Sequence, residues 1–365
     1  MPVELVSDQD PYLVLEALDR PGPVVVTNHR LPVPTDLRQR LARVAPDTWL
    51  VAFTSGSTAH PRGVCRTRAS WMLSVAPLAA AIGAGTSSTV LVPGPLSSTL
   101  FLHGAWHARE VGARVLLGPL DSAKPWDIAH LLPSQLAALL ASPADLTGRT
   151  AVVAGAALAG STAAAAMGRG MRVVRYYGAA ELSFVAIGSE DGLRPFPGVE
   201  VAERAAELWV RSPYVAAGYL PDVSDGDPAG GALRRDQAGW ATVGDRGEVR
   251  ADGTVVVRGR GAGVVQTGAA TIHAADVEHV LRGAPGVRDA VVVGVPHAWL
   301  GQVVAAAVES SSATSATMRR WARSRLDSSA LPRRWVVTNE LPRTPAGKVD
   351  RDAVSRLVAR GHPSD

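Results

Sequence analysis

Apolar runs alternate with segments of helical spacing through the first half of this chain. The runs have the length of buried strands and lie at 21–28, 49–53, 89–92, 113–117, 150–153 and 171–176. The segments with helical spacing lie between them, at 36–44, 71–82, 102–111 and 161–168. Strands that alternate with helices pack as layers around a largely parallel sheet. The expected fold class is therefore α/β, with layered sheets covered by helices.

From Glu207 the pattern changes to short strands and turns, which predict a small β-barrel-like part. These strands are expected at 208–211, 240–243, 248–250 and 255–258, and Asp252-Gly253 is a strong hairpin signal. After Gly259 a smaller α+β unit follows, with helices at 274–281 and 317–326 and strands at 287–295, 303–309 and 334–338. The predicted organisation is a large N-terminal domain (1–258), a glycine-rich hinge (259–263) and a C-terminal domain (264–365).

Composition excludes several classes of protein. Hydrophobic residues make up 47% of the chain, which is typical of a globular protein. The net charge of +4 is mild, and basic residues alternate with acidic ones without interleaved aromatics, so no nucleic-acid partner is indicated. The N-terminus lacks the pattern of a signal peptide, and the alanine-rich stretches are interrupted by Gly, Pro and Ser, so no membrane span is expected. The expected location is the cytoplasm.

The single cysteine, Cys65, excludes a disulfide within the monomer. Two interpretations stay open, a nucleophile and a small buried side chain, of which the second is the more common.

The segment from Thr54 to Gly63 is typical of a phosphate-binding loop. It follows the apolar run 49–53 and concentrates hydroxyls and glycines; the residues expected to bind are Thr54, Ser55, Gly56, Ser57, Thr58 and Arg62. Backbone N–H groups and hydroxyls of such a loop can hold a polyphosphate. The alternative is a flexible serine-rich turn.

Carboxylates also follow predicted strands. Glu181 ends the motif that begins at Tyr176-Tyr177-Gly178, directly after the strand 171–176, where open α/β sheets bind ligands. It could hold Mg²⁺, and a tyrosine beside it could stack on a base. Asp245 ends another strand and could accept hydrogen bonds from a ribose. The alternatives are a glutamate that stabilises a helix start and an ordinary turn aspartate.

Near the C-terminus, Lys348 lies in the Pro- and Gly-structured segment Leu341–Arg351. Such a lysine is often only solvated. In this order and spacing, however, the segments resemble the adenylate-forming superfamily of acyl-CoA synthetases, luciferases and peptide-synthetase adenylation domains. The resemblance extends from Trp49 to Val354. It implies that the C-terminal domain is a lid, that ATP and Mg²⁺ are used, and that a carboxylic acid is converted first to an acyl-AMP and then to a thioester.

The resemblance also assigns roles for the nucleotide. The loop Thr54–Gly63 would hold the β- and γ-phosphates, and Tyr177 would pack on the adenine, with Gly155 and Ala156 on its other side. Asp245 would bind the ribose hydroxyls, and Arg260, at the hinge, would contact the nucleotide.

Two residues are assigned to the chemistry. Glu181 would bind Mg²⁺, and Lys348 would reach the carboxylate and the α-phosphate in the first step. A mobile point charge delivered by lid closure can stabilise charge that develops at phosphorus.

Several positions depart from the family pattern. In the phosphate loop Ala59 replaces a glycine and Arg62 a lysine, and Arg62 keeps the charge but not the geometry of a point donor. Ala180 stands where a hydroxyl would contact the α-phosphate. At the hinge, Ala262 and Gly263 replace two aspartates.

The acyl site is the least defined part of the prediction. Ser98 occupies the place of a histidine or aromatic residue, and with Gly178 it is assigned to the substrate pocket. Aromatic side chains could line this pocket or belong to the core: Trp71, Phe101, Trp106 and Phe184. His103 and His107, one helical turn apart, lack a third ligand and are interpreted as helix-face residues.

About fifty residues precede the phosphate loop, fewer than in most of the family, so one wall of the acyl pocket is expected to be short. In this respect the chain is similar to o-succinylbenzoate-CoA ligases. A homodimer that closes the pocket is one hypothesis. The expected substrate is a small or medium carboxylic acid. The acceptor stays open between coenzyme A, the phosphopantetheine of an acyl carrier protein and another nucleophile. The alternative from another class is a degenerate nucleotide-binding module.

Overall fold

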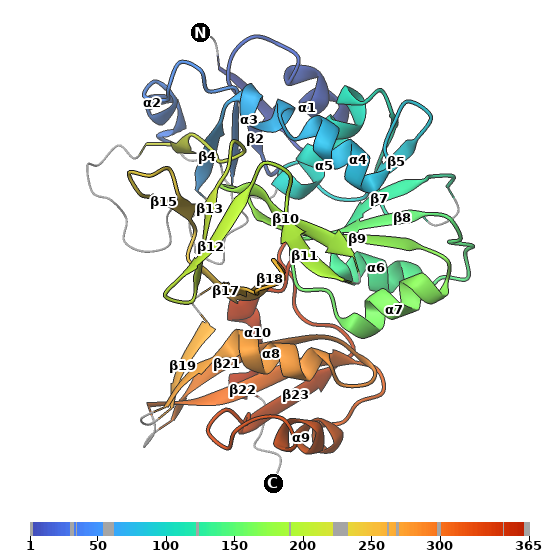
Figure 1. Cartoon of the computed structure of the whole chain (residues 1–365), viewed down its shortest axis with the longest axis vertical. Helices are drawn as coiled ribbons and strands as arrows, with labels where there is room; N and C mark the ends of the chain where they lie inside the picture. Colours follow the sequence, from blue (N-terminus) through green and yellow to red (C-terminus); the bar gives the residue numbers. More distant parts are fainter. Residues whose placement is uncertain are drawn as a thin grey trace.

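The computed structural model describes residues 3–29, 33, 35–53, 62–121, 124–189, 191–221, 233–260, 263–267, 270–297, 301–345 and 347–360, without the side chains of 259, 260, 264, 266, 270, 271 and 301. They form a large N-terminal part and a smaller C-terminal part (Figure 1). This confirms the predicted α/β class with a small C-terminal α+β unit. The boundaries 1–258, 259–263 and 264–365 stay a prediction.

The first sheet of the N-terminal part combines three parallel strands with two antiparallel ones. Its order is β1-β2-β3-β4-β14, with β1, β2 and β3 parallel. The strands are β1 (Glu4–Ser7), β2 (Val24–Thr27), β3 (Leu50–Phe53), β4 (Gly63–Arg66) and β14 (Gly218–Tyr219). Helices α1 (Pro11–Ala17) and α2 (Leu37–Leu41) connect its parallel strands. The predicted phosphate loop begins where β3 ends.

The second sheet contains a parallel block in the order β9-β8-β7-β5-β6. Its strands are β5 (Thr89–Val92), β6 (Arg114–Leu117), β7 (Ile128–Leu131), β8 (Thr150–Val153) and β9 (Arg172–Ala179). The helices beside it are α3 (Arg68–Met72), α4 (Val75–Ile82), α5 (Thr99–Glu110), α6 (Pro133–Leu140) and α7 (Gly160–Gly168). The helix predicted at 71–82 is thus two helices, which meet near Ser74.

Short antiparallel strands continue this sheet beyond β9, in the region predicted to be barrel-like. They are β10 (Ser183–Ser189), β11 (Gly192–Pro195), β12 (Glu200–Arg204), β13 (Glu207–Arg211), β15 (Arg234–Arg235), β16 (Ala241–Thr242), β17 (Asp245–Val249) and β18 (Val255–Arg260). The Asp252-Gly253 hairpin forms as predicted, because β17 and β18 pair antiparallel around it and Gly253 adopts a positive φ of 81°.

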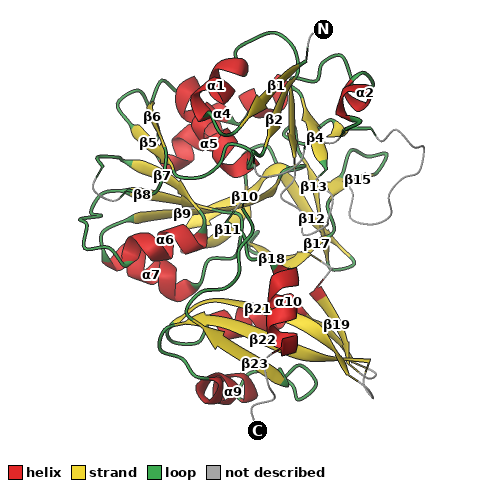
Figure 2. Cartoon of the chain, turned by 180° about the vertical axis from the view of Figure 1, so that it is seen from behind, coloured by secondary structure: helices red, strands yellow, loops and turns green. Residues whose placement is uncertain are grey.

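The C-terminal part has its own sheet, in which the long strands β21 and β22 pair antiparallel (Figure 2). Its elements are β19 (Val264–Thr267), β20 (Ala270–His273), α8 (Ala274–Arg282), β21 (Val287–His297), β22 (Gly301–Ser310), α9 (Ser315–Arg323), β23 (Arg334–Thr338) and α10 (Arg351–Arg360). The hydrophobic clusters of the two parts share no residue, so each part has its own core.

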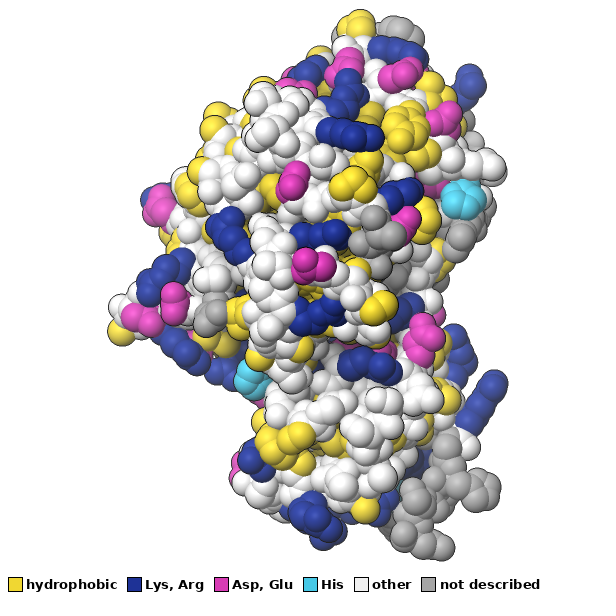
Figure 3. Space-filling model, turned by 90° about the vertical axis from the view of Figure 1, so that its right-hand side faces the viewer, with side chains coloured by type: hydrophobic (Ala, Val, Ile, Leu, Met, Phe, Trp, Pro, Cys, Tyr) yellow, Lys and Arg dark blue, Asp and Glu magenta, His cyan; other side chains and the backbone are white. Residues whose placement is uncertain are grey.

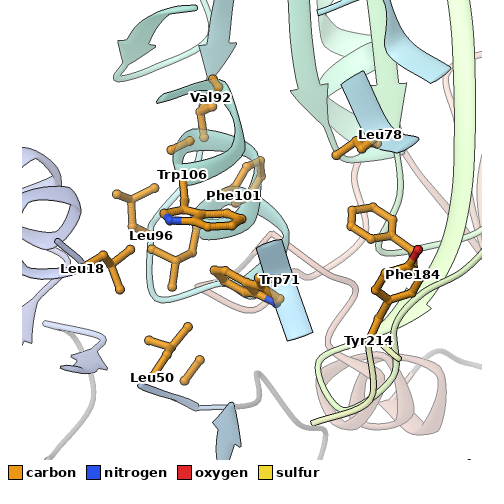
Figure 4. Close-up of a cluster of buried hydrophobic side chains, with 14 of the residues drawn as sticks. Leu18, Leu50, Trp71, Leu78, Val92, Leu96, Phe101, Trp106, Phe184 and Tyr214 are labelled. Atoms are coloured by element: carbon orange, nitrogen blue, oxygen red, sulfur yellow. The ribbon is translucent and has the colours of Figure 1, made fainter. Parts of the chain in front are cut away.

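The main core of the N-terminal part lies under α5 and contains the four aromatic residues that the sequence left between pocket and core. Trp71, Phe101, Trp106 and Phe184 are at most 3% exposed (Figure 4). Trp71 and Trp106 pack with their ring centroids 5.4 Å apart. These residues therefore belong to the core.

No described helix is long and apolar enough to cross a membrane. On the face in Figure 3, basic side chains are interspersed with acidic ones, as the sequence indicates.

Candidate active site

Parallel strands of the second sheet end at a common edge, where several of the expected site residues lie. Strand β8 leads into Gly155 and Ala156, which are both exposed, and β9 contains Tyr177 and Gly178. The carboxyl ends of such strands form the usual ligand site of open α/β sheets. A Cβ at Gly178 would lie 2.0 Å from the carbonyl oxygen of Ser183, so only glycine allows β9 and β10 to approach here.

Lys348 of the C-terminal part reaches this edge. A Cβ added to Gly155 would lie 3.8 Å from Lys348 Cε and 2.8 Å from a methyl carbon of Leu132. Gly155 has a φ of +87°, a conformation that L side chains rarely adopt. Glycine at position 155 therefore avoids a clash with Leu132 and lets the lysine stem lie within van der Waals distance of the backbone.

The turn that holds Lys348 is fixed within the C-terminal part. Arg343 and Val349 form a β-bridge, and the amide of Thr344 donates to the carbonyl of Lys348 at 2.7 Å. Glu309 of β22 accepts hydrogen bonds from the Arg343 guanidinium, at 2.8 Å, and from the amide of Leu341, at 3.1 Å. These contacts tie the turn to the central strands of the C-terminal sheet.

The residues expected at the adenine and the ribose are neighbours. The Tyr177 hydroxyl donates to Oδ2 of Asp245 at 2.7 Å, and Asp245 is 7% exposed. Asp245 pairs with Arg260 across β17 and β18, which places the backbone of Arg260 beside this pair. The Arg260 side chain lies outside the described residues.

Glu181 is held from two sides. The Tyr219 hydroxyl donates to its Oε1 at 2.7 Å, and the amide of Ala216 donates to its carbonyl oxygen at 2.7 Å. Burial and the charge of Glu181 raise the pKa of Tyr219 to about 12, so this phenol stays protonated and donates. The guanidinium of Arg62 lies 5.5 Å from the centre of the Tyr219 ring. Tyr219 was not among the predicted site residues, because no sequence pattern marks it.

The environment of Glu181 fits a magnesium ion. Among the described residues, its Oε2 has no hydrogen-bond partner, so one hard oxygen ligand is available. No group of three metal-binding side chains occurs in the described part of the chain. A single carboxylate agrees with the way Mg²⁺ usually binds, through one or two carboxylates plus substrate phosphates.

Ser98 lies at the start of α5 and is 9% exposed, and its side chain makes no capping hydrogen bond. Its neighbour Ser97 donates to Oδ2 of Asp8 at 2.5 Å, and the other oxygen of Asp8 accepts from the amide of His29 at 2.9 Å. The loop before α5 is thereby tied to the ends of β1 and β2. No local pattern marks Asp8, because its partners Ser97 and His29 are distant in the chain.

A cavity of about 340 Å³ adjoins this loop, at the ends of β1, β5 and β6. It is lined by Asp8, Gln9, Pro11, Pro93, Gly94, Pro95, Leu117, Gly118 and Pro119.

His103 and His107 lie on the buried face of α5 and belong to the core. His103 Nε2 lies 3.1 Å from the Ser74 hydroxyl, and His107 Nε2 lies 3.0 Å from the carbonyl oxygen of Val75. Cys65 is also buried, and burial raises the pKa of its thiol to about 11. A thiol with this pKa is not a nucleophile at neutral pH, which favours the interpretation as a small buried side chain.

Most of the predicted phosphate loop lies outside the described residues. Thr54, Ser55, Gly56, Ser57 and Thr58 lie outside the described residues, as do Ala59 in the same loop and Ala262 at the hinge. The roles assigned to the site residues stay predictions.

Two family profiles match the chain. The profile of the AMP-binding enzymes matches residues 3–220, and that of the AMP-binding enzyme C-terminal domain matches residues 276–348. The chain belongs to the AMP-binding enzyme family. This confirms the resemblance to adenylate-forming enzymes.

Curated relatives of this AMP-binding enzyme are acyl-CoA ligases. An uncharacterized acyl–CoA ligase, YhfT of Bacillus subtilis, is 29% identical over 339 residues, which cover 84% of this chain and 68% of the relative. A probable 2-succinylbenzoate–CoA ligase of Mycobacterium tuberculosis is 30% identical over 346 residues, which cover 87% and 86%. The expected class, an AMP-forming acid–thiol ligase, is thereby confirmed, while the specific acid is not.

Solved structures agree in fold. Escherichia coli MenE with bound OSB-AMS has a TM-score of 0.76 at 22% identity, covering 93% of this chain and 82% of that one. The amide bond synthetase McbA of Marinactinospora thermotolerans has a TM-score of 0.73 at 27% identity, covering 97% and 80%. The similarity to MenE concerns the fold alone.

Proposed function

We propose that this AMP-binding enzyme activates a small or medium carboxylic acid with ATP and transfers the acyl group to coenzyme A. In the first step a carboxylate oxygen forms a bond to the α-phosphorus, and the bond to the β-phosphate breaks, releasing pyrophosphate. In the second step a thiol attacks the acyl carbonyl and AMP leaves. The observation that carries the proposal is Lys348, which lies against Gly155 at the carboxyl edge of the parallel strands.

The side chains at this edge suit the first step. Lys348 supplies a positive charge for the oxygens of the reacting carboxylate and α-phosphate, where negative charge shifts during transfer. Glu181 would hold Mg²⁺, whose charge offsets that of the phosphates. Tyr177 and Asp245 would bind the adenine and the ribose, so ATP binding must replace or rearrange their mutual hydrogen bond.

Two assays identify the acid and the acceptor. ATP–pyrophosphate exchange is measured over a panel of acids, for the wild type and Lys348→Ala, and thioester formation is then measured with coenzyme A and with a phosphopantetheinyl carrier protein. We expect acid-dependent exchange that falls at least ~100-fold in Lys348→Ala, since loss of one transition-state donor costs about 10²–10³ in rate. Exchange without acid, or equal exchange in the variant, would contradict the mechanism. If the thioester forms only on the carrier protein, the acceptor is the carrier protein and not coenzyme A.

A further inference from the structure

Arg66, at the end of β4, is a completely buried cation beside the candidate site. The residue is 1% exposed, and none of its hydrogen bonds within the described part of the chain goes to a carboxylate. Its strongest partners are backbone carbonyls, and Nη1 also donates to the Ser70 hydroxyl at 3.4 Å. Nη2 and Nε donate to the carbonyl oxygen of Ala180 at 2.5 and 3.2 Å, and Nη1 donates to that of Tyr214 at 2.8 Å. The face of Trp71 lies 5.9 Å away.

This arrangement has an energetic cost. Burial lowers the pKa of Arg66 to about 10, and the negative charge of Glu181 opposes that shift. Arg66 therefore stays charged at neutral pH. The guanidinium is nevertheless retained, and its removal would leave the two buried carbonyls without this donor.

The two carbonyls bound by Arg66 lie just before Glu181 and just before the residue that holds its backbone. Ala180 directly precedes Glu181, and Tyr214 lies two residues before Ala216, whose amide donates to the carbonyl of Glu181 at 2.7 Å. One guanidinium thus joins both backbone segments around Glu181.

We propose that Arg66 is a positioning residue for the magnesium–nucleotide site: it clamps the backbone on both sides of Glu181 and supplies the fixed positive charge behind this carboxylate. The inference depends on the proposed role of Glu181 in magnesium binding. Arg66 fixes the backbone from which the carboxylate projects, while Tyr219 orients Oε1 and leaves Oε2 for the metal. The backbone clamp also provides a link at Ala180 where the family pattern has a hydroxyl.

The test compares Arg66→Met with Arg169→Met. Arg169 is a matched control, because its guanidinium also donates to backbone carbonyls, those of Leu140 at 2.9 Å, Ser142 at 2.8 Å and Ala144, at a loop away from Glu181. Binding of α,β-methylene-ATP is measured by calorimetry at increasing Mg²⁺ concentrations, together with the melting temperature of each variant. This readout does not need turnover.

Both variants are expected to melt at lower temperature, but only Arg66→Met should need about 10–100-fold more Mg²⁺ for half-maximal analogue binding, the usual effect of removing a residue that orients a metal ligand. A folded Arg66→Met with wild-type magnesium dependence would overturn the proposal. If Arg66→Met does not fold, Arg66→Lys is tested instead, since lysine keeps the charge but loses the bidentate clamp. A magnesium dependence of Arg66→Lys equal to that of the wild type would also overturn the proposal. Absence of acid-dependent exchange in the wild type would instead contradict the proposed function, and the two failures are thereby separate.

Discussion

Buried histidines should make this protein sensitive to mild acid. His103, His107 and His130 are at most 4% exposed, and burial lowers the pKa of each. His130 on β7 is the clearest case, because its pKa falls from 6.5 to about 3 and neither ring nitrogen has a hydrogen-bond partner among the described residues.

The direction follows from proton binding in the two states. Between pH 6.5 and about 3, the unfolded chain binds a proton at His130 and the folded protein does not. The free energy of unfolding is therefore highest, as far as His130 is concerned, above pH 6.5, and it falls as the pH drops below that value. From pH 7.5 to 5.5 the loss through His130 is about 1.4 kcal/mol, and His103 and His107 act in the same direction.

Urea unfolding at pH 7.5 and 5.5 checks this for the wild type and for His130→Leu, which has a similar volume and does not titrate. We expect the variant to lose about 1.4 kcal/mol less than the wild type over this interval. His279→Gln is the control, because this histidine is exposed on α8, and its acid dependence is expected to match the wild type. Equal losses in the wild type and His130→Leu would refute the reasoning.

Two further predictions concern the C-terminal part. Gly347→Ala should slow pyrophosphate exchange about tenfold, because a Cβ would lie 2.5 Å from a methyl carbon of Leu132, and its φ of +78° should cost about 1–3 kcal/mol of unfolding free energy. Gly148→Ala, with a φ of +76° and open space around it, is the control, and equal slowing in both would contradict the role of the Leu132 contact. Glu278→Gln should cost about 2–4 kcal/mol of unfolding free energy in urea, because this carboxylate is 3% exposed and pairs with Arg282 and Arg351 at 3.2 and 2.5 Å. A loss below ~1 kcal/mol would show that Asp289, which also pairs with Arg282 at 2.9 Å, compensates.

The local patterns of the sequence predicted the strands and helices well where the apolar period is clear. Strands β5, β8 and β23 form at the predicted residues, and α8 begins at Ala274 as expected. The prediction of one continuous helix over 71–82 was wrong, because two helices form there. The chain turns near Ser74, whose hydroxyl donates to the carbonyl oxygen of Trp71 at 2.6 Å.

The site was predictable only where the family pattern marks a residue. Lys348, Tyr177 and Asp245 were predicted from their motifs, whereas Arg66 and Asp8 were not. Each of them has a partner more than eighty positions away in the chain, and no local period or spacing encodes such a contact. An arginine in an apolar strand could have raised attention, because a buried guanidinium requires several acceptors.

The fixed turn around Lys348 has a consequence for rates. Since Arg343 and Glu309 hold this turn to its own sheet, the backbone of Lys348 leaves the Gly155 edge only when the whole C-terminal part moves. On the proposed mechanism, the observed rate of the first step is then the intrinsic rate multiplied by the population of the closed arrangement. Contacts between the two parts, such as the Arg258–Asp276 ion pair at 3.1 Å, set that population. Substitutions there would change the turnover of every acid by one common factor and leave the preference among acids unchanged.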